Sequence, residues 1–181
     1  MDNGAGSYRR FLDGDTGAFD DIMNELFYSL VFFANSYVHD VHTAEDIAID
    51  TFSDLIVHRH RYNFKVTLKT YLFTLARNRS IDYIRHCKVI NFTELTETDS
   101  LSDDEKSLEE SVLADEKRRA VNRAVSKLPA DMRTAVHLVY FEEMTYEEAA
   151  RVMKKSRKQV DNLLYRAKKE LRVLLGEDGE A

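Results

Sequence analysis

The sequence predicts an all-α protein made of two helical modules joined by an acidic linker. One proline and six glycines in 181 residues are few for a chain with many turns. Apolar residues recur at spacings of three and four along most of the chain, and strand-like alternation is rare. Residues 89–111 break this pattern with acids, serines and threonines, so we expect one module over residues 8–88 and another over residues 112–175.

The first module is expected to be a bundle of three to four helices. A broad apolar stripe predicts a helix from about residue 16 to residue 37. Thr43, followed three residues later by Asp46, resembles a capping box and predicts a second helix as far as about residue 59. A third helix is expected over residues 67–87, where leucines and isoleucines alternate with cations at helical spacing.

Charge is segregated along the chain, although the net charge is only −6. Residues 1–57 carry eleven acids and two bases, and residues 89–150 have a net charge of −8. Residues 58–88 and residues 151–172 each have a net charge of +7. Two basic blocks in an acidic chain suggest two nucleic-acid contacts, with acidic segments left to face other partners.

The second basic block is predicted to form a helix-turn-helix from Thr145 to Leu171. Ser156 and Gln159 can form a capping box at the start of its second helix. Charged amphipathic helices are common and most of them bind nothing, but nine Lys or Arg against two acids in residues 151–172 favour DNA binding. The candidate DNA contacts lie on or beside the face opposite the apolar stripe: Arg157, Lys158, Gln159, Asn162, Tyr165, Arg166 and Lys169.

The first basic block begins with a loop, residues 58–65, in which cations and aromatic rings are interleaved. Such a mixture suits single-stranded nucleic acid, because rings stack on bases and cations follow phosphates. His58 and His60 lack the spacing and partners of a metal site, and no catalytic motif is present, so we expect no metal, no cofactor and no enzymatic activity. No apolar leader precedes the first module, so a cytoplasmic protein is expected.

The second predicted helix carries a stripe of acids. Asp46, Asp50 and Asp54 stand four residues apart, where like charges repel one another. A basic partner surface would relieve this repulsion, so the stripe predicts a protein docking site.

Three motifs, in order, resemble the extracytoplasmic-function (ECF) branch of the bacterial sigma-70 family. Residues 44–52 (AEDIAIDTF) and residues 68–85 (LKTYLFTLARNRSIDYIR) are similar to conserved region two of these sigma factors. Residues 128–138 (LPADMRTAVHL) and the helix-turn-helix that follows are similar to their domain four. The resemblance extends over about residues 8–175.

The resemblance implies a transcription-initiation subunit that binds core RNA polymerase and promoter DNA. Polymerase contacts, on the clamp helices of the β′ subunit, are expected at Asp46, Asp50 and Phe52. The second module would contact the β flap and place its recognition helix on the −35 element. Contacts that read and melt the −10 element are expected at Tyr62, Asn63, Phe64, Arg77, Asn78, Asp82 and Arg85.

The linker would run toward the active-site and RNA-exit channel of the polymerase, and an anti-sigma factor is a further possible partner. The sequence departs from the family's pattern at Ile49, where glutamine is common, and at Tyr71, where tryptophan is common. An alternative reading is a helix-turn-helix regulator that is not a polymerase subunit. The sequence leaves open whether the two modules clasp each other in the free protein.

Overall fold

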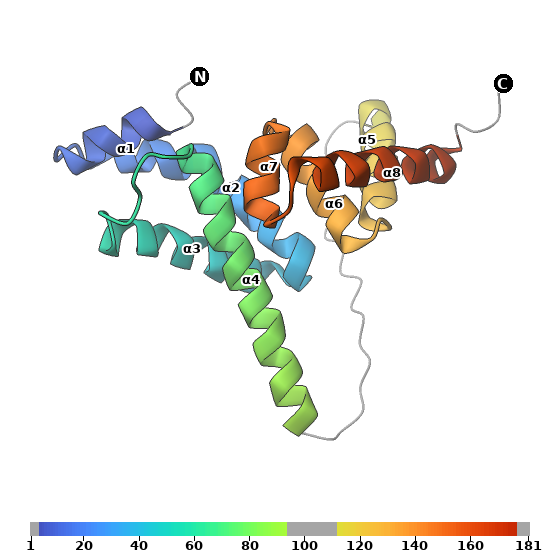
Figure 1. Cartoon of the computed structure of the whole chain (residues 1–181), viewed down its shortest axis with the longest axis horizontal. Helices are drawn as coiled ribbons and strands as arrows, with labels where there is room; N and C mark the ends of the chain where they lie inside the picture. The colour runs from blue at the N-terminus through green and yellow to red at the C-terminus, as the bar shows by residue number, and fades with distance from the viewer. Residues whose placement is uncertain (1–3, 94–111, 177–181) are drawn as a thin grey trace.

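The structure is a computed structural model that describes residues 4–93 and 112–176. All regular structure in this part of the chain is helical, which confirms the predicted all-α class (Figure 1). Residues 94–111, most of the predicted linker, lie outside the described residues. The elements are α1 (Ala5–Leu12), α2 (Gly17–Val38), α3 (Val41–Val57), α4 (Leu68–Thr93), α5 (Val112–Ser126), α6 (Ala130–Val136), the π-helical turn η1 (His137–Phe141), α7 (Tyr146–Met153) and α8 (Arg157–Leu175).

Helices α1 to α4 form the first module, in which α2 packs on α1, α3 and α4. The helix α1 was not predicted, because its few apolar residues stand among glycines and charges. Tyr8 of α1 is fully buried, and its hydroxyl donates to the carbonyl oxygens of Leu55 at 3.1 Å and Arg59 at 2.9 Å. These carbonyls lie at the end of α3, where helices leave such groups unpaired. Burial, reinforced by Tyr71, raises the pKa of the Tyr8 hydroxyl to about 12.

Two helix boundaries of the first module differ from the prediction. Asp40, rather than Thr43, caps α3, since the Asp40 carboxylate accepts from the backbone N–H of Thr43 at 2.8 Å. Thr67 precedes α4, and its hydroxyl oxygen accepts from the N–H of Thr70 at 3.2 Å. The helix α4 continues to Thr93, beyond the expected end at residue 87, and its C-terminal half projects from the body of the molecule (Figure 1).

The second module contains α5, α6, η1 and the helix-turn-helix α7–α8. Pro129 stands directly before α6. Both helices of the helix-turn-helix begin with a complete capping box, one formed by Thr145 and Glu148 and the other by Ser156 and Gln159. Between α6 and α7 the chain widens into the π-helical turn, where the N–H of Glu142 bonds to the carbonyl five residues earlier.

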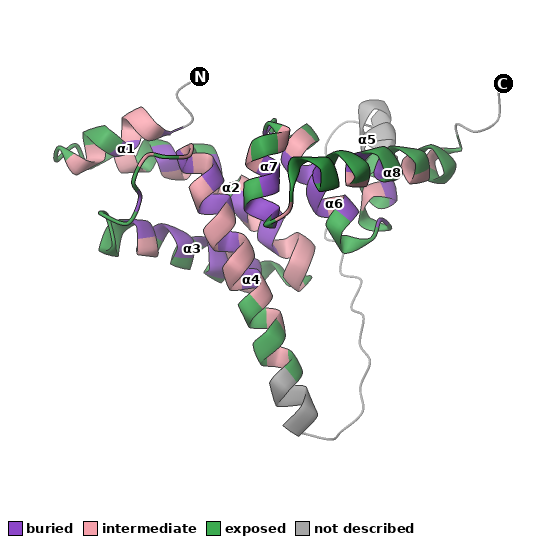
Figure 2. Cartoon of the chain, in the orientation of Figure 1, coloured by how far each residue is buried: buried purple, intermediate pink, exposed green. Residues whose placement is uncertain are grey.

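The two modules pack against each other, with α4 on α7 and α2 on α6. The rings of Phe32 and Phe33 stack on His137 at centroid distances of 5.1 and 5.6 Å. Arg133 donates to the carbonyl oxygen of Ser36 at 3.1 Å. Buried residues, purple in Figure 2, therefore run from α2 and α4 into α6 and α7 as one continuous core.

Candidate nucleic-acid and polymerase interfaces

The recognition helix α8 presents a shallow hollow on the face turned away from the core. Val160, Leu164 and Ala167 are buried on the packed side, as their spacing predicts. The hollow has a volume of about 220 Å³ and is lined by Lys155, Gln159, Asn162, Leu163 and Arg166. The structure thus brings together three predicted contacts, Gln159, Asn162 and Arg166. Their amide and guanidinium groups are of the kinds that read base edges in the major groove.

The other predicted contacts of α8 lie outside the lining of this hollow. Lys158, Tyr165 and Lys169 are exposed, Tyr165 to 74%. Arg157 is also exposed and pairs with Glu147 of α7 at 3.0 Å. These four exposed side chains are cationic or phenolic, the kinds of group that contact backbone phosphates.

One basic residue of α8 faces elsewhere. The ammonium nitrogen of Lys168 lies 5.5 Å from the centroid of the Tyr140 ring, and its interaction with the Tyr140 hydroxyl raises the pKa of Lys168. Lys168 therefore ties α8 to the π-helical turn. Its place in the basic block gave no signal of this role.

The loop between α3 and α4 is organised around buried rings. Tyr62 is buried, packs on Phe64 at a centroid distance of 4.6 Å, and donates from its hydroxyl to the carbonyl of Val66 at 2.7 Å. Asn63 is exposed, and its side-chain oxygen accepts from the N–H of Lys65 at 3.1 Å. Phe64 has a positive φ of 58°. Of the three predicted loop contacts, Asn63 and part of Phe64 reach the surface, whereas Tyr62 shapes the loop from within.

A hollow of about 410 Å³ opens beside this loop. Its lining from the first module includes Phe64, Lys65 and Thr67, together with Arg9, whose guanidinium lies 4.9 Å from the centroid of the Phe64 ring. Its lining from the second module is Glu147, Glu148 and Arg151. Arg9 was missed by the sequence reasoning because it belongs to the unpredicted helix α1.

The predicted contacts on α4 are spread along the helix. Arg77 is half-buried near Tyr37, and burial raises the pKa of Tyr37 despite hydrogen bonds to its hydroxyl from Thr134 and Arg77. Asn78 is also half-buried. Asp82 and Arg85 are exposed on the projecting part of α4 and pair with each other at 3.4 Å. This part of α4 is therefore a polar, solvent-facing surface.

The predicted polymerase contacts on α3 fall on different sides of that helix. Asp46 and Asp50 are exposed, and Ile49 between them is 49% exposed. Phe52 is only 2% exposed and packs its ring on those of Phe19 and Phe27. The outer surface of α3 is therefore a mixed acidic and apolar strip, and Phe52 supports it from the core.

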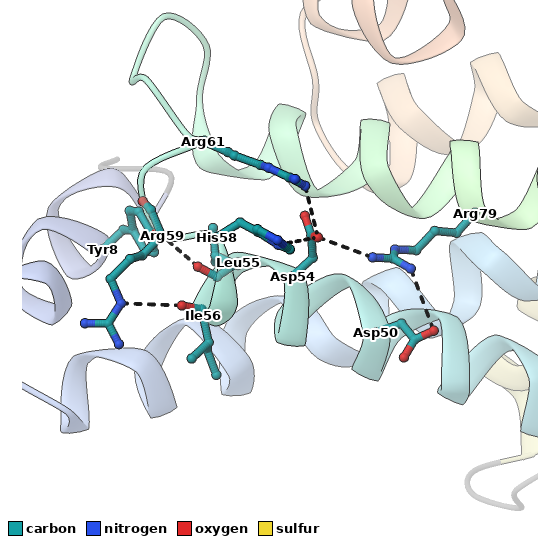
Figure 3. Close-up of polar contacts among 9 residues, drawn as sticks. All are labelled: Tyr8, Asp50, Asp54, Leu55, Ile56, His58, Arg59, Arg61 and Arg79. Atoms are coloured by element: carbon teal, nitrogen blue, oxygen red, sulfur yellow. Dashed lines mark hydrogen bonds and ion pairs between the residues drawn. The ribbon is translucent and has the colours of Figure 1, made fainter.

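The acidic stripe of α3 is partly neutralised within the molecule. Asp54, 13% exposed, lies 2.9 Å from Nδ1 of His58, 3.5 Å from Arg61 and 3.7 Å from Arg79 (Figure 3). Arg79, from α4, also lies 3.7 Å from Asp50. The repulsion that predicted a basic partner is thus relieved by Arg79 at two of three positions. Within the described residues, Asp46 has neither an ion pair nor a side-chain hydrogen bond.

Other site types find no candidate in the part of the chain that the structure describes. Residues 4–93 and 112–176 contain no group of three or more His, Cys, Asp or Glu side chains that could hold a metal ion. In the same residues, no helix is both long and apolar enough to span a bilayer.

Comparison with known protein families places matches on both modules. Sigma-70 region 2 matches residues 22–88, and Sigma-70, region 4 matches residues 118–171. The ECF RNA polymerase sigma factor SigM of Bacillus subtilis is 31% identical over 154 residues, which cover 84% of this chain and 89% of SigM. The RNA polymerase sigma-H factor of Pseudomonas aeruginosa is 30% identical over 168 residues, 87% of this chain and 86% of its own.

Two solved structures share the fold. The sigma factor RpoE of Bartonella quintana, in complex with the anti-sigma factor NepR, matches with a TM-score of 0.66 at 23% identity, over 88% of this chain and 98% of RpoE. CnrH, in complex with the cytosolic domain of CnrY, matches with a TM-score of 0.64 at 20% identity, over 98% of this chain and 97% of CnrH.

Proposed function

Because the chain belongs to the sigma-70 family and resembles its ECF members over both modules, it directs transcription initiation, and we propose how its surfaces divide that work. It binds core RNA polymerase and promoter DNA. The observation that carries the proposal is the hollow on α8, where Gln159, Asn162 and Arg166 converge opposite the buried face of a region-four helix.

In this proposal α8 enters the major groove of the −35 element. Gln159, Asn162 and Arg166 contact base edges, since amide and guanidinium groups match the donors and acceptors displayed there. Gln159 also caps α8 through the N–H of Ser156, at 2.7 Å, so its side chain is held in place before DNA arrives. Arg157, Lys158, Tyr165 and Lys169 hold phosphates and fix the register of the helix on the duplex.

The loop between α3 and α4 and the exposed surface of α4 would contact the −10 element. Phe64 lines the hollow of about 410 Å³, which has the aromatic and cationic lining that suits an unstacked base, and Asn63 is exposed on the same loop. Tyr62 contributes by holding Phe64. Arg77, Asn78, Asp82 and Arg85 would extend the contact along α4.

The outer strip of α3 would dock on the clamp helices of β′ through Asp46, Asp50 and Ile49, with Phe52 holding the strip from behind. The second module would contact the β flap. Residues 89–111 would run toward the active-site and RNA-exit channel, where their acids resemble the charge of nucleic acid. In this proposal the chain is a regulator that catalyses no reaction of its own. It acts in the cytoplasm, where the polymerase acts. An anti-sigma factor, of the kind bound to RpoE, is proposed as a further partner.

Run-off transcription tests the central claim. Purified chain and core polymerase, given a pool of genomic fragments, should yield transcripts that neither component gives alone. Asp46→Lys should lose core polymerase in a pull-down, whereas Asp20→Lys, an exposed acid on α2, should retain it. A helix-turn-helix regulator that is not a polymerase subunit would give no chain-dependent transcript and no Asp46-dependent pull-down.

The division of labour on α8 has its own test. Arg166→Ala should relax preference at one base pair of the −35 element, at about 1–3 kcal/mol, if Arg166 reads a base. Lys169→Ala should weaken binding to all sequences alike and lower the salt slope by about one. Uniform weakening by Arg166→Ala would remove it from the base-reading set.

A further inference from the structure

The two modules meet at the first turn of α4, where two carboxylates of the second module bind donors of the first. The ammonium nitrogen of Lys69 lies 2.8 Å from a carboxylate oxygen of Glu142 and donates to the Glu142 carbonyl at 2.8 Å. The hydroxyls of Thr67 and Thr70 donate to one carboxylate oxygen of Glu148 at 3.0 and 3.4 Å. The contact thus places two anions on one cation and two hydroxyls.

Both carboxylates are held as anions by their surroundings. Burial opposes ionisation of Glu142, yet the nearby His137 ring and the Lys69 ammonium outweigh it and lower the pKa of Glu142. The Glu142 side chain is 6% exposed, and Nε2 of His137 lies 3.3 Å from its other oxygen, although not in hydrogen-bonding geometry. Burial likewise opposes ionisation of Glu148, but bonds from Thr145 and then from Thr67 and Thr70 lower its pKa.

The donors that hold these carboxylates are also the kinds of group that hold phosphates. Lys and Thr side chains at the first turn of a helix commonly contact the nucleic-acid backbone. Thr67 lines the hollow beside the aromatic loop, directly after Phe64 and Lys65. Glu148 lines the same hollow from the other module, so the second module covers it.

This closed arrangement does not fit simultaneous reading of two promoter elements. Elements centred near −10 and −35 are about 25 base pairs apart, which at 3.4 Å per base pair is on the order of 80 Å. In the structure the aromatic loop and α7, the helix that precedes the recognition helix, line one hollow. The modules must therefore separate before both can reach DNA.

We propose that Thr67, Lys69 and Thr70 bind a backbone phosphate of the opened promoter strand, and that Glu142 and Glu148 occupy this site in the closed free protein. The inference rests on the proposed function of the first module. Separation of the modules exchanges two carboxylates for a phosphate, so the free chain is kept from DNA until polymerase draws the modules apart.

Variants on the two sides of the contact should both open the modules but differ in how tightly the open chain binds DNA. In the double variant Glu142→Gln, Glu148→Gln the competing charges are gone, and glutamine at 148 still completes a capping box. We expect this variant to bind single-stranded −10 DNA about tenfold more tightly than the free wild type, because a larger fraction is open. Lys69→Met should also open the modules, yet bind the strand less tightly than the double glutamine variant, with a salt slope lower by about 0.7.

The experiment uses the full chain and a labelled non-template strand from a promoter that gives a run-off transcript with the wild-type holoenzyme. Opening is measured by energy transfer between dyes at Asn24→Cys and Lys127→Cys, both exposed positions, with Cys87→Ser. The matched control is Glu147→Gln. Glu147 lines the same hollow but pairs with Arg157 of its own module, so this variant should change neither the energy transfer nor the strand binding.

Two results would overturn the inference while leaving the proposed function intact. Unchanged energy transfer in the double glutamine variant would show that the carboxylates do not hold the modules. Strand binding by Lys69→Met as tight as that of the double glutamine variant would show that Lys69 holds no phosphate. If the wild-type holoenzyme gave no transcript from any fragment, the proposed function itself would fail, and the inference with it.

Discussion

At the residue scale, side chains of the same type on one helix do different work according to what the fold brings to them. Asp46, Asp50 and Asp54 look equivalent in the sequence. In the structure Asp54 contacts three basic side chains, Asp50 shares one of them, Arg79, and Asp46 faces solvent. Arg79 could not be assigned to this group beforehand, because it comes from α4 and arrives only through the packing of α4 on α3.

This difference predicts that Asp54 contributes to the stability of the protein, whereas Asp46 contributes to polymerase binding. Asp54→Ala should lower the free energy of unfolding by about 1–2 kcal/mol, since it removes the carboxylate that His58 and Arg61 contact and leaves Arg79 with Asp50 alone. Asp46→Ala should change it by less than about 0.5 kcal/mol, yet weaken the pull-down of core polymerase. Urea unfolding followed by circular dichroism measures the first effect. Equal loss of stability in both variants would mean that Asp46 also has a structural partner.

Phe52 and Tyr62 show the same limit of residue-level prediction. Both belong to sets expected to contact a partner, and both are buried. A sequence pattern gives the spacing of an aromatic residue but not the neighbours that cover it. Tyr62 is covered by Tyr8, which belongs to α1, and by Phe64, whose backbone has a positive φ. The exposed members, Asn63 and Asn162, were assigned correctly to the surface because amides rarely fill a core.

At the scale of elements, prediction succeeded where a local signal sets the boundary. Ser156 and Gln159 determine the start of α8 through bonds within one turn, and Pro129 determines the start of α6. The helix α1 and the turn η1 depend on contacts from other elements. The hydroxyl of Tyr8 anchors α1 to the end of α3, and His137 of η1 lies against Phe32 and Phe33 of α2.

The turn of the helix-turn-helix contains a conformation that favours glycine. Lys154 ends α7 with φ 54° and ψ 42°, the left-handed region in which a side chain is strained. Lys154→Gly should therefore raise the free energy of unfolding by about 0.5–1 kcal/mol, whereas Lys154→Ala keeps the Cβ atom and should give no gain. Thermal unfolding of the two variants measures the difference. A stabilisation by alanine as large as that by glycine would point to loss of the lysine charge as the cause.

At the scale of the whole molecule, the main finding is the contact between the two modules. The acidic and basic blocks of the sequence suggested such a contact only in outline. The sequence placed basic blocks at residues 58–88 and 151–172 and acids between them. It did not show that Glu142 and Glu148, acids of the second module, would meet Lys69, Thr67 and Thr70 in the first block. That pairing requires the π-helical turn, which carries Glu142 toward α4 while Phe32 and Phe33 hold His137.

The closed form should therefore loosen in acid. The pKa values of Glu142 and Glu148 are lowered in the closed protein, because the neighbouring His137 ring, the Lys69 ammonium and the threonine hydroxyls outweigh burial. A group with a lowered pKa stabilises the structure above its ordinary pKa, 4.5 for glutamate, and this contribution is lost as the pH falls through the lowered value. Energy transfer between the dyes at positions 24 and 127 should stay constant from pH 7 to about 5 and fall below 4.5.

Comparison with the glutamine variants shows which groups cause that acid response. In the double variant Glu142→Gln, Glu148→Gln energy transfer should already be low at pH 7 and should change little on acidification, because the titrating carboxylates are absent. Glu147→Gln should follow the wild-type curve. A wild-type curve that falls above pH 5.5 would contradict the carboxylate mechanism, because both glutamates have lowered pKa values.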